Sequence, residues 1–202
     1  MAQKSSFKIP RKFRSFLIFL AIVLIAYLLI KILPTDAQKV PTEFLNAKYN
    51  ASSVAQDIVS ISNQLTNDLD EISRLESEKK YTEAINLLAQ ALEKNKEARE
   101  KAVLLSEELA KMALAVPNIS PSGASQIALQ AISSETTLIS RLIAYNDYLN
   151  QLLEELRLEF LGKSSGGNKI QELISKINEE VRAINELNAK YNTLMEKFDG
   201  KQ

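Results

Sequence analysis

The chain has 202 residues, with 25 Lys and Arg residues, 25 Asp and Glu residues, no His and no Cys. This length accommodates one domain with an anchor, or two small domains. Without His or Cys there is no imidazole base, thiol nucleophile, disulfide or zinc site of the usual kind. We therefore expect no enzyme, no cofactor and no metal site.

The zero net charge conceals an uneven distribution. Five basic residues and no acidic residue precede position 16, namely Lys4, Lys8, Arg11, Lys12 and Arg14. All 25 acidic residues lie from Asp36 onward, together with 19 of the basic residues. Nucleic acids are normally bound through basic patches, so this mildly acidic remainder argues against a nucleic-acid partner.

Residues 16–33, FLIFLAIVLIAYLLIKIL, form the most apolar stretch, and the first fifteen of them carry no charge. As a helix, eighteen residues rise about 27 Å, close to the roughly 30 Å hydrocarbon core of a bilayer. The stretch therefore predicts a single transmembrane helix that anchors the chain in lipid. Its anchoring side chains are Phe16, Leu17, Ile18, Phe19, Leu20, Ile22, Val23, Leu24, Ile25, Tyr27, Leu28, Leu29, Ile30 and Leu33.

The basic arm before this stretch predicts its orientation. Lys and Arg residues that flank a membrane span are retained on the cytoplasmic side. We therefore expect a cytoplasmic amino terminus and an extracytoplasmic carboxy-terminal domain at the cell membrane. A signal peptide cleaved after Ala37 is the alternative, but the apolar run is as long as the longest usual signal cores or longer, which favours a retained anchor.

A linker is predicted over residues 34–43, because Pro34 and Pro41 disfavour helix there. A first helix is predicted over about 52–78 from an apolar stripe at three- and four-residue steps: Val54, Ile58, Ile61, Leu65, Leu69, Ile72 and Leu75. The stripe then moves to the opposite face, which favours a hairpin near residues 76–82 over one long rod.

The second predicted helix covers about 82–116. Its segment 93–101, EKNKEAREK, is nearly devoid of apolar residues. A recognition patch usually carries one sign of charge, so this mixture of signs indicates a solvated face with ion pairs inside the helix.

Two prolines and a glycine in residues 117–123 end this helix. A third helix is predicted over about 124–161, where a broad apolar arc indicates packing against two neighbours in a bundle. After a glycine-rich turn, a last helix over about 169–198 carries a seven-residue repeat, in which Glu180 interrupts the pattern and Val181 supplies the contact. The repeat predicts a helix interface, inside the bundle or with a second copy: Ile170, Leu173, Ile177, Ile184, Leu187, Tyr191, Leu194 and Phe198.

These elements predict an all-α protein with one transmembrane helix followed by an elongated antiparallel bundle of about four helices. Adjacent carboxylates on a helix point about 100° apart, so the three Glu-Glu pairs do not form a shared site. The leading hypothesis is a non-catalytic structural or interaction protein of the cell envelope that acts through helix-mediated contacts with unidentified proteins or with itself. The alternative is an extracytoplasmic ligand-sensing bundle that works with a signalling partner.

Overall fold

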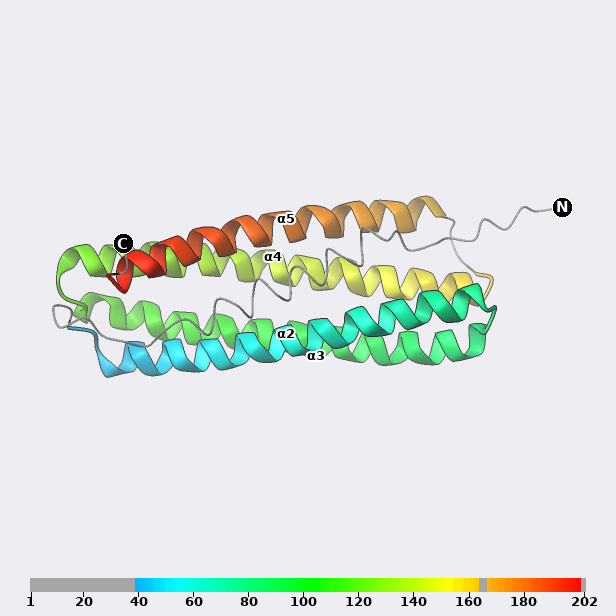
Figure 1. Cartoon of the computed structure of the whole chain (residues 1–202), viewed down its shortest axis with the longest axis horizontal. Coiled ribbons are helices and arrows are strands. Elements are labelled where there is room, and N and C mark those ends of the chain that lie inside the picture. Colours follow the sequence, from blue (N-terminus) through cyan, green and yellow to red (C-terminus); the bar gives the residue numbers. More distant parts are fainter. Residues whose placement is uncertain (1–38, 164–166, 201–202) are drawn as a thin grey trace.

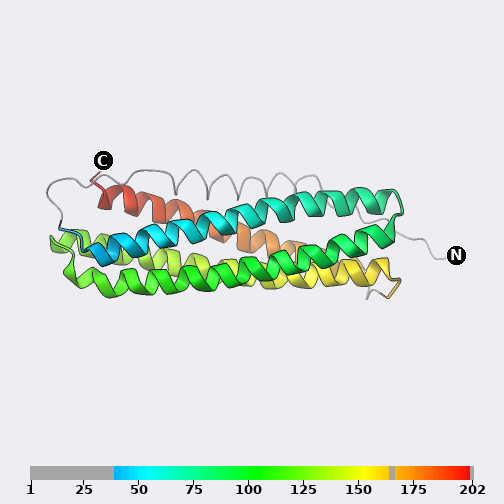
Figure 2. The ribbon, with the colours of Figure 1, turned by 90° about the horizontal axis from the view of Figure 1, so that it is seen from below.

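A computed structural model describes residues 39–163 and 167–200 of the chain. This part folds into four long helices, α2 (Thr42–Ser77), α3 (Tyr81–Ala115), α4 (Ser122–Phe160) and α5 (Gly167–Phe198), with a short 3-10 helix, η1 (Val116–Asn118), before α4. The helices run up and down in an elongated bundle (Figures 1 and 2). The all-α class and the helical bundle are therefore confirmed.

The two ends of the bundle differ in what they contain (Figure 1). At one end, called the Lys39 end, lie the starts of α2 and α4 and the ends of α3 and α5, and the backbones of Lys39 and Ser120 exchange two hydrogen bonds. At the other, called the Lys79 end, lie the turns from α2 to α3 and from α4 to α5. The longest helix, α4, has 39 residues, which corresponds to about 58 Å at 1.5 Å per residue.

The first helix starts earlier than the sequence pattern predicted. It begins at Thr42, directly after Pro41, whereas the prediction placed its start near residue 52. Phe44 is buried, and Ala47, Ala51 and Ala55 continue the buried stripe toward the amino terminus. Small alanines give a weak periodic signal, which is why the prediction began only at the large residue Val54.

The chain turns back between α2 and α3, so the hairpin is the observed arrangement. Lys79 has φ of 60°, its amide donates to the carbonyl of Glu76, and the amide of Lys80 donates to the carbonyl of Leu75. This pair of hydrogen bonds is a Schellman motif, which satisfies the last carbonyls of a helix. The end of α4 has the same motif, with Gly162 at φ of 71°.

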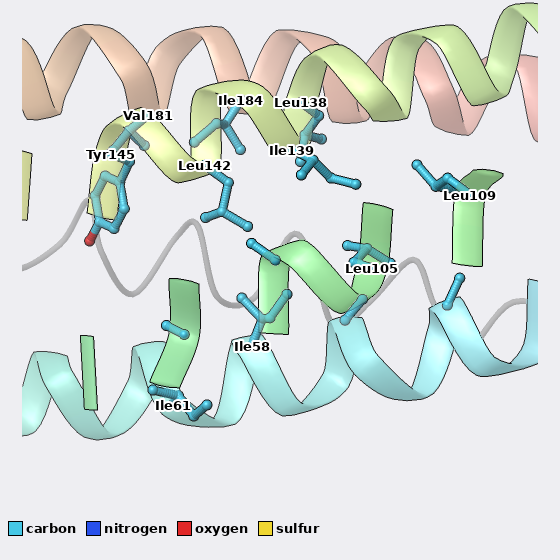
Figure 3. Packing of buried hydrophobic residues seen from close by; sticks show 14 of the residues in the cluster. Ile58, Ile61, Leu105, Leu109, Leu138, Ile139, Leu142, Tyr145, Val181 and Ile184 are labelled. Atoms are coloured by element: carbon cyan, nitrogen blue, oxygen red, sulfur yellow. The ribbon is translucent and has the colours of Figure 1, made fainter. Parts of the chain in front are cut away.

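Each helix packs against the next one along the chain, α2 on α3, α3 on α4 and α4 on α5. Figure 3 shows the centre of the shared core, where Ile58 of α2, Leu105 of α3, Leu142 of α4 and Ile184 of α5 point inward. Within the described residues, the backbones of α2 and α5 do not pack closely along their length. They meet at the Lys39 end, where the ring centroids of Phe44 and Phe198 are 5.6 Å apart.

No helix in residues 39–163 or 167–200 has the length and apolar character needed to cross a membrane. The predicted transmembrane segment, residues 16–33, and the basic residues before it lie outside the described residues.

Candidate functional site

The seven-residue repeat of α5 packs inside this chain's own bundle. Val181 is fully buried, and Glu180 beside it is buried with its Oε1 3.4 Å from Nη1 of Arg141 on α4. The predicted interface residues therefore contribute to the core, and self-association through α5 stays a prediction that would have to use its solvent-facing side. Of these residues, Ile170, Leu173, Ile177, Ile184 and Phe198 are buried, and Leu187, Tyr191 and Leu194 are partly buried against the core.

The charged segment 93–101 of α3 connects three helices. Three of its four basic residues form ion pairs with neighbouring helices, whereas the sequence predicted pairs inside the helix. Exposed ion pairs contribute only about 0–1 kcal/mol each, so we expect them to favour the register between helices more than overall stability. The pairs are Lys94 with Asp68 of α2 at 2.7 Å, Lys101 with Asp57 of α2 at 2.7 Å, and Arg99 with Asp147 of α4 at 3.0 Å.

A cleft of about 460 Å³ lies between α3 and α4. At the cleft, Asn95 is 2% exposed and its Nδ2 donates to the backbone carbonyl of Asn146 at 2.8 Å. Oδ1 of Asn95 has no hydrogen-bond partner, although it is buried. The lining carries both signs of charge, with Lys96, Arg99 and Arg157 against Glu93, Asp147 and Glu154. Such a lining suits a small polar molecule that carries both charges or many hydroxyl groups.

Glu135 is a carboxyl group inside the apolar core. It is 9% exposed and its Oε2 has no hydrogen-bond partner. Burial raises the pKa of Glu135 to about 7, because removal from water disfavours the charged form. At neutral pH this carboxyl group therefore holds a proton for a large fraction of the time.

A pair of perturbed carboxyl groups, Glu76 and Glu159, lies at the Lys79 end. Burial, with the charge of Glu159 as a second cause, raises the pKa of Glu76 to about 7. Burial also raises the pKa of Glu159, whose Oε2 has no hydrogen-bond partner. Two carboxyl groups that disfavour each other's charge can hold a proton near neutral pH, and in the described part they do not belong to a cluster that could hold a metal ion.

One glutamate of each adjacent pair forms an ion pair with a basic side chain, and for Glu180 this is Arg141. Oε1 of Glu108 binds Nζ of Lys111 at 2.5 Å, and a carboxylate oxygen of Glu154 lies 3.2 Å from Nη1 of Arg157. Across residues 39–163 and 167–200, no three His, Cys, Asp or Glu side chains lie together as ligands for a metal ion. These carboxylates act in the described part as partners of basic side chains.

Sequence reasoning missed Asn95 and Glu135, the two buried polar residues with unpartnered oxygens in the middle of the bundle. The signal was a gap in an apolar stripe. On α3, Asn95 fills the step between Ala91 and Ala98, and on α4 Glu135 fills the step four residues after Ala131. A polar residue at such a step has its Cβ directed to the core by the helix period alone.

Comparisons with models of known families, with curated proteins and with solved structures found no match to this chain. The proposed function therefore rests on the residues of the chain itself.

Proposed function

We propose that this chain is a non-catalytic, single-pass membrane protein of the cell envelope whose helical rod acts through contacts with other proteins. The observation that carries the proposal is the apolar run of residues 16–33, uncharged over its first fifteen positions, behind five basic residues. A run of this length buries its apolar side chains in a bilayer, and the basic residues keep the amino terminus in the cytoplasm. The rod is then extracytoplasmic.

The geometry of the rod supports this arrangement. Lys39, the first described residue, comes shortly before α2, whose start lies at one end of the bundle (Figure 1). Residues 34–38 separate it from Leu33, a distance of at most about 21 Å when extended. The anchor is thus attached to one end of the rod through a short segment. A rod held in this way presents the long sides of its helices, which suit protein contacts better than small-molecule chemistry.

Fractionation of cells that express the full chain with a carboxy-terminal tag tests the anchor. We expect the protein to stay in the membrane pellet after carbonate washing, with the tag open to protease added from the extracytoplasmic side. A variant that lacks residues 1–38 is the matched control and should leave the membrane while keeping its helical circular dichroism. Recovery of a soluble form that lacks residues 1–37 would instead show a cleaved signal peptide.

The cleft at Asn95 favours a second candidate, a ligand-sensing bundle. Its support is a buried, unpartnered acceptor beside a lining with both signs of charge. A thermal-shift screen of amino acids, short peptides and polyols tests this candidate. A stabilising ligand should lose its effect in the Asn95→Leu variant, and a screen without any stabilising compound counts against sensing.

A further inference from the structure

Large apolar side chains on the surface of the bundle are concentrated at the Lys39 end. Leu45 and Tyr49 of α2 are 45% and 66% exposed, Leu114 of α3 is 81% exposed and Leu129 of α4 is 54% exposed. Each lies within seven residues of the end of its helix, or about 11 Å along the axis. Of the other three exposed large apolar residues in the described part, Val103 and Leu104 lie 12 and 11 residues before the end of α3, and Leu161 lies at the Lys79 end.

These four side chains come from three helices around one end of the rod. Leu45 and Tyr49 are four residues apart, so they stand side by side on one face of α2. Leu114 lies in the last turn of α3, and Leu129 lies two turns after the start of α4. Exposed apolar side chains on three helices at one end suit a surface that meets the rod at that end, unlike a groove along one side of the rod.

The proposed anchor holds this end of the rod close to the bilayer. The Lys39 end is held within about 21 Å of Leu33, the last apolar residue of the proposed anchor. Tyr is also among the residues that are enriched where a protein meets the lipid headgroups. The nearest large apolar surface available to Leu45 and Tyr49 is therefore the membrane that holds the anchor.

The charges at the two ends favour the same orientation. Within two turns of the Lys39 end, four acidic residues are balanced by four basic ones, Lys39, Lys48, Lys111 and Lys197. Acidic residues outnumber basic ones at the Lys79 end even when Glu76 and Glu159 are left out as protonated, and they include Glu71, Glu78, Glu83 and Glu172. Anionic lipid attracts basic side chains and repels acidic ones, so the Lys79 end is directed away from the membrane.

We infer that the Lys39 end is a lipid-contacting surface, seated in the headgroup region through Leu45, Tyr49, Leu114 and Leu129. The inference rests on the proposed membrane anchor and adds to it the orientation of the rod. With its end in the headgroups, the rod stands away from the membrane and leaves its long sides free for protein partners. A rod tethered only by a flexible linker would be free to lie on the bilayer.

Single tryptophans test this contact, because the chain contains no Trp of its own. The variants are Leu45→Trp and Tyr49→Trp at the Lys39 end, with Leu161→Trp at the Lys79 end as the matched control. Leu45 and Leu161 have nearly the same exposure, 45% and 46%. Each full-length variant is reconstituted, free of detergent, in vesicles of phosphatidylcholine and phosphatidylglycerol. Its tryptophan fluorescence is then compared between vesicles with brominated acyl chains and vesicles without them.

We expect blue-shifted emission and quenching by brominated lipid for Leu45→Trp and Tyr49→Trp, and neither for Leu161→Trp. If all three variants stay with the vesicles after carbonate washing but show equal, unquenched emission, the lipid contact is overturned and the proposed anchor is retained. A blue shift at residues 45 and 49 without quenching would also overturn it, because a second copy of the chain would then cover the end. Failure of all variants to remain with vesicles would overturn the anchor and the inference together.

Discussion

Glu135 shows how a single residue can make the stability of the bundle depend on pH. Its side chain is buried on α4 and its Oε2 has no hydrogen-bond partner. Because burial raises its pKa to about 7, the folded chain holds a proton that the unfolded chain releases near pH 4.5. The free energy of unfolding therefore falls as pH rises from about 4.5 through 7, and the full penalty is present above that range.

We predict that Glu135→Gln raises the free energy of unfolding at pH 8 by up to about 3 kcal/mol, since each unit of pKa shift corresponds to 1.36 kcal/mol. At pH 4.5 the effect should be small, because the wild-type carboxyl group is then neutral. Urea unfolding of the full chain in detergent at both pH values measures this.

Glu76→Gln is the control for the Glu135 experiment, because the pKa of Glu76 is raised in the same pH range by burial and by Glu159. It should reduce the pH dependence less, since its side chain is only partly buried. Glu71 and Glu172 have lowered pKa values and lose their ion pairs only at more acidic pH. An equal gain from Glu135→Gln at pH 4.5 and pH 8 would contradict a titrating buried carboxyl group.

The position of Glu135 on the core face of α4 follows from the helix period, but its protonation does not. The period predicts the direction of a Cβ and nothing of the solvent that neighbouring helices exclude. The same holds for Asn95, whose donor finds a backbone carbonyl 51 residues later in the chain, on another helix. The chemistry of these two residues therefore depends on helix pairing, which a single stripe does not specify.

At the scale of elements, the two Schellman turns differ in the residue that occupies the left-handed position. Gly162 has φ of 71°, and Lys79 has φ of 60° at the equivalent place. A side chain with a Cβ costs roughly 1–2 kcal/mol in this conformation, and glycine avoids the cost. The turn at Lys79 is therefore the more strained of the two.

We predict that Lys79→Gly stabilises the chain by about 0.5–1 kcal/mol, a little less than the conformational cost, because glycine also gains freedom in the unfolded state. Gly162→Ala should destabilise it by a similar amount, since space is open around Gly162 and only its backbone angle opposes a Cβ. Paired thermal unfolding of both variants measures the two effects. Changes of the same sign in both would contradict a shared backbone cause.

Helix ends were predictable where turn residues mark them and less so where they do not. The prolines and glycine of residues 117–123 and the glycines of residues 162–168 predicted both breaks, since these residues have distinct backbone preferences. The turn at residues 78–80 contains neither, and only the change of apolar face indicated it. The start of α2 was predicted ten residues too late, because alanines bury little surface and contribute little to an apolar helical pattern.

At the scale of the whole molecule, α2 and α5, the first and last of the described helices, are joined at one end. Phe44 and Phe198 are buried in contact there, and Nζ of Lys48 lies 3.5 Å from Oδ1 of Asp199 and 5.9 Å from the centroid of the Phe198 ring. The contact closes the bundle at the Lys39 end, where the proposed anchor is attached. Tyr81 and Phe160 form a similar ring contact at the Lys79 end, with centroids 5.7 Å apart, but both are only partly buried.

We predict that Phe198→Ala destabilises the full chain by about 3–5 kcal/mol, the usual cost of removing a buried ring. Because α5 has no other close backbone contact with α2 in the described residues, its last turns should lose protection from hydrogen exchange before α4 does. Phe160→Ala is the matched control and should cost less, with faster exchange confined to the Lys79 end. Hydrogen exchange by mass spectrometry distinguishes the two ends. Equal loss of protection along all of α5 in both variants would show that the Lys39 end has no special part in holding the bundle closed.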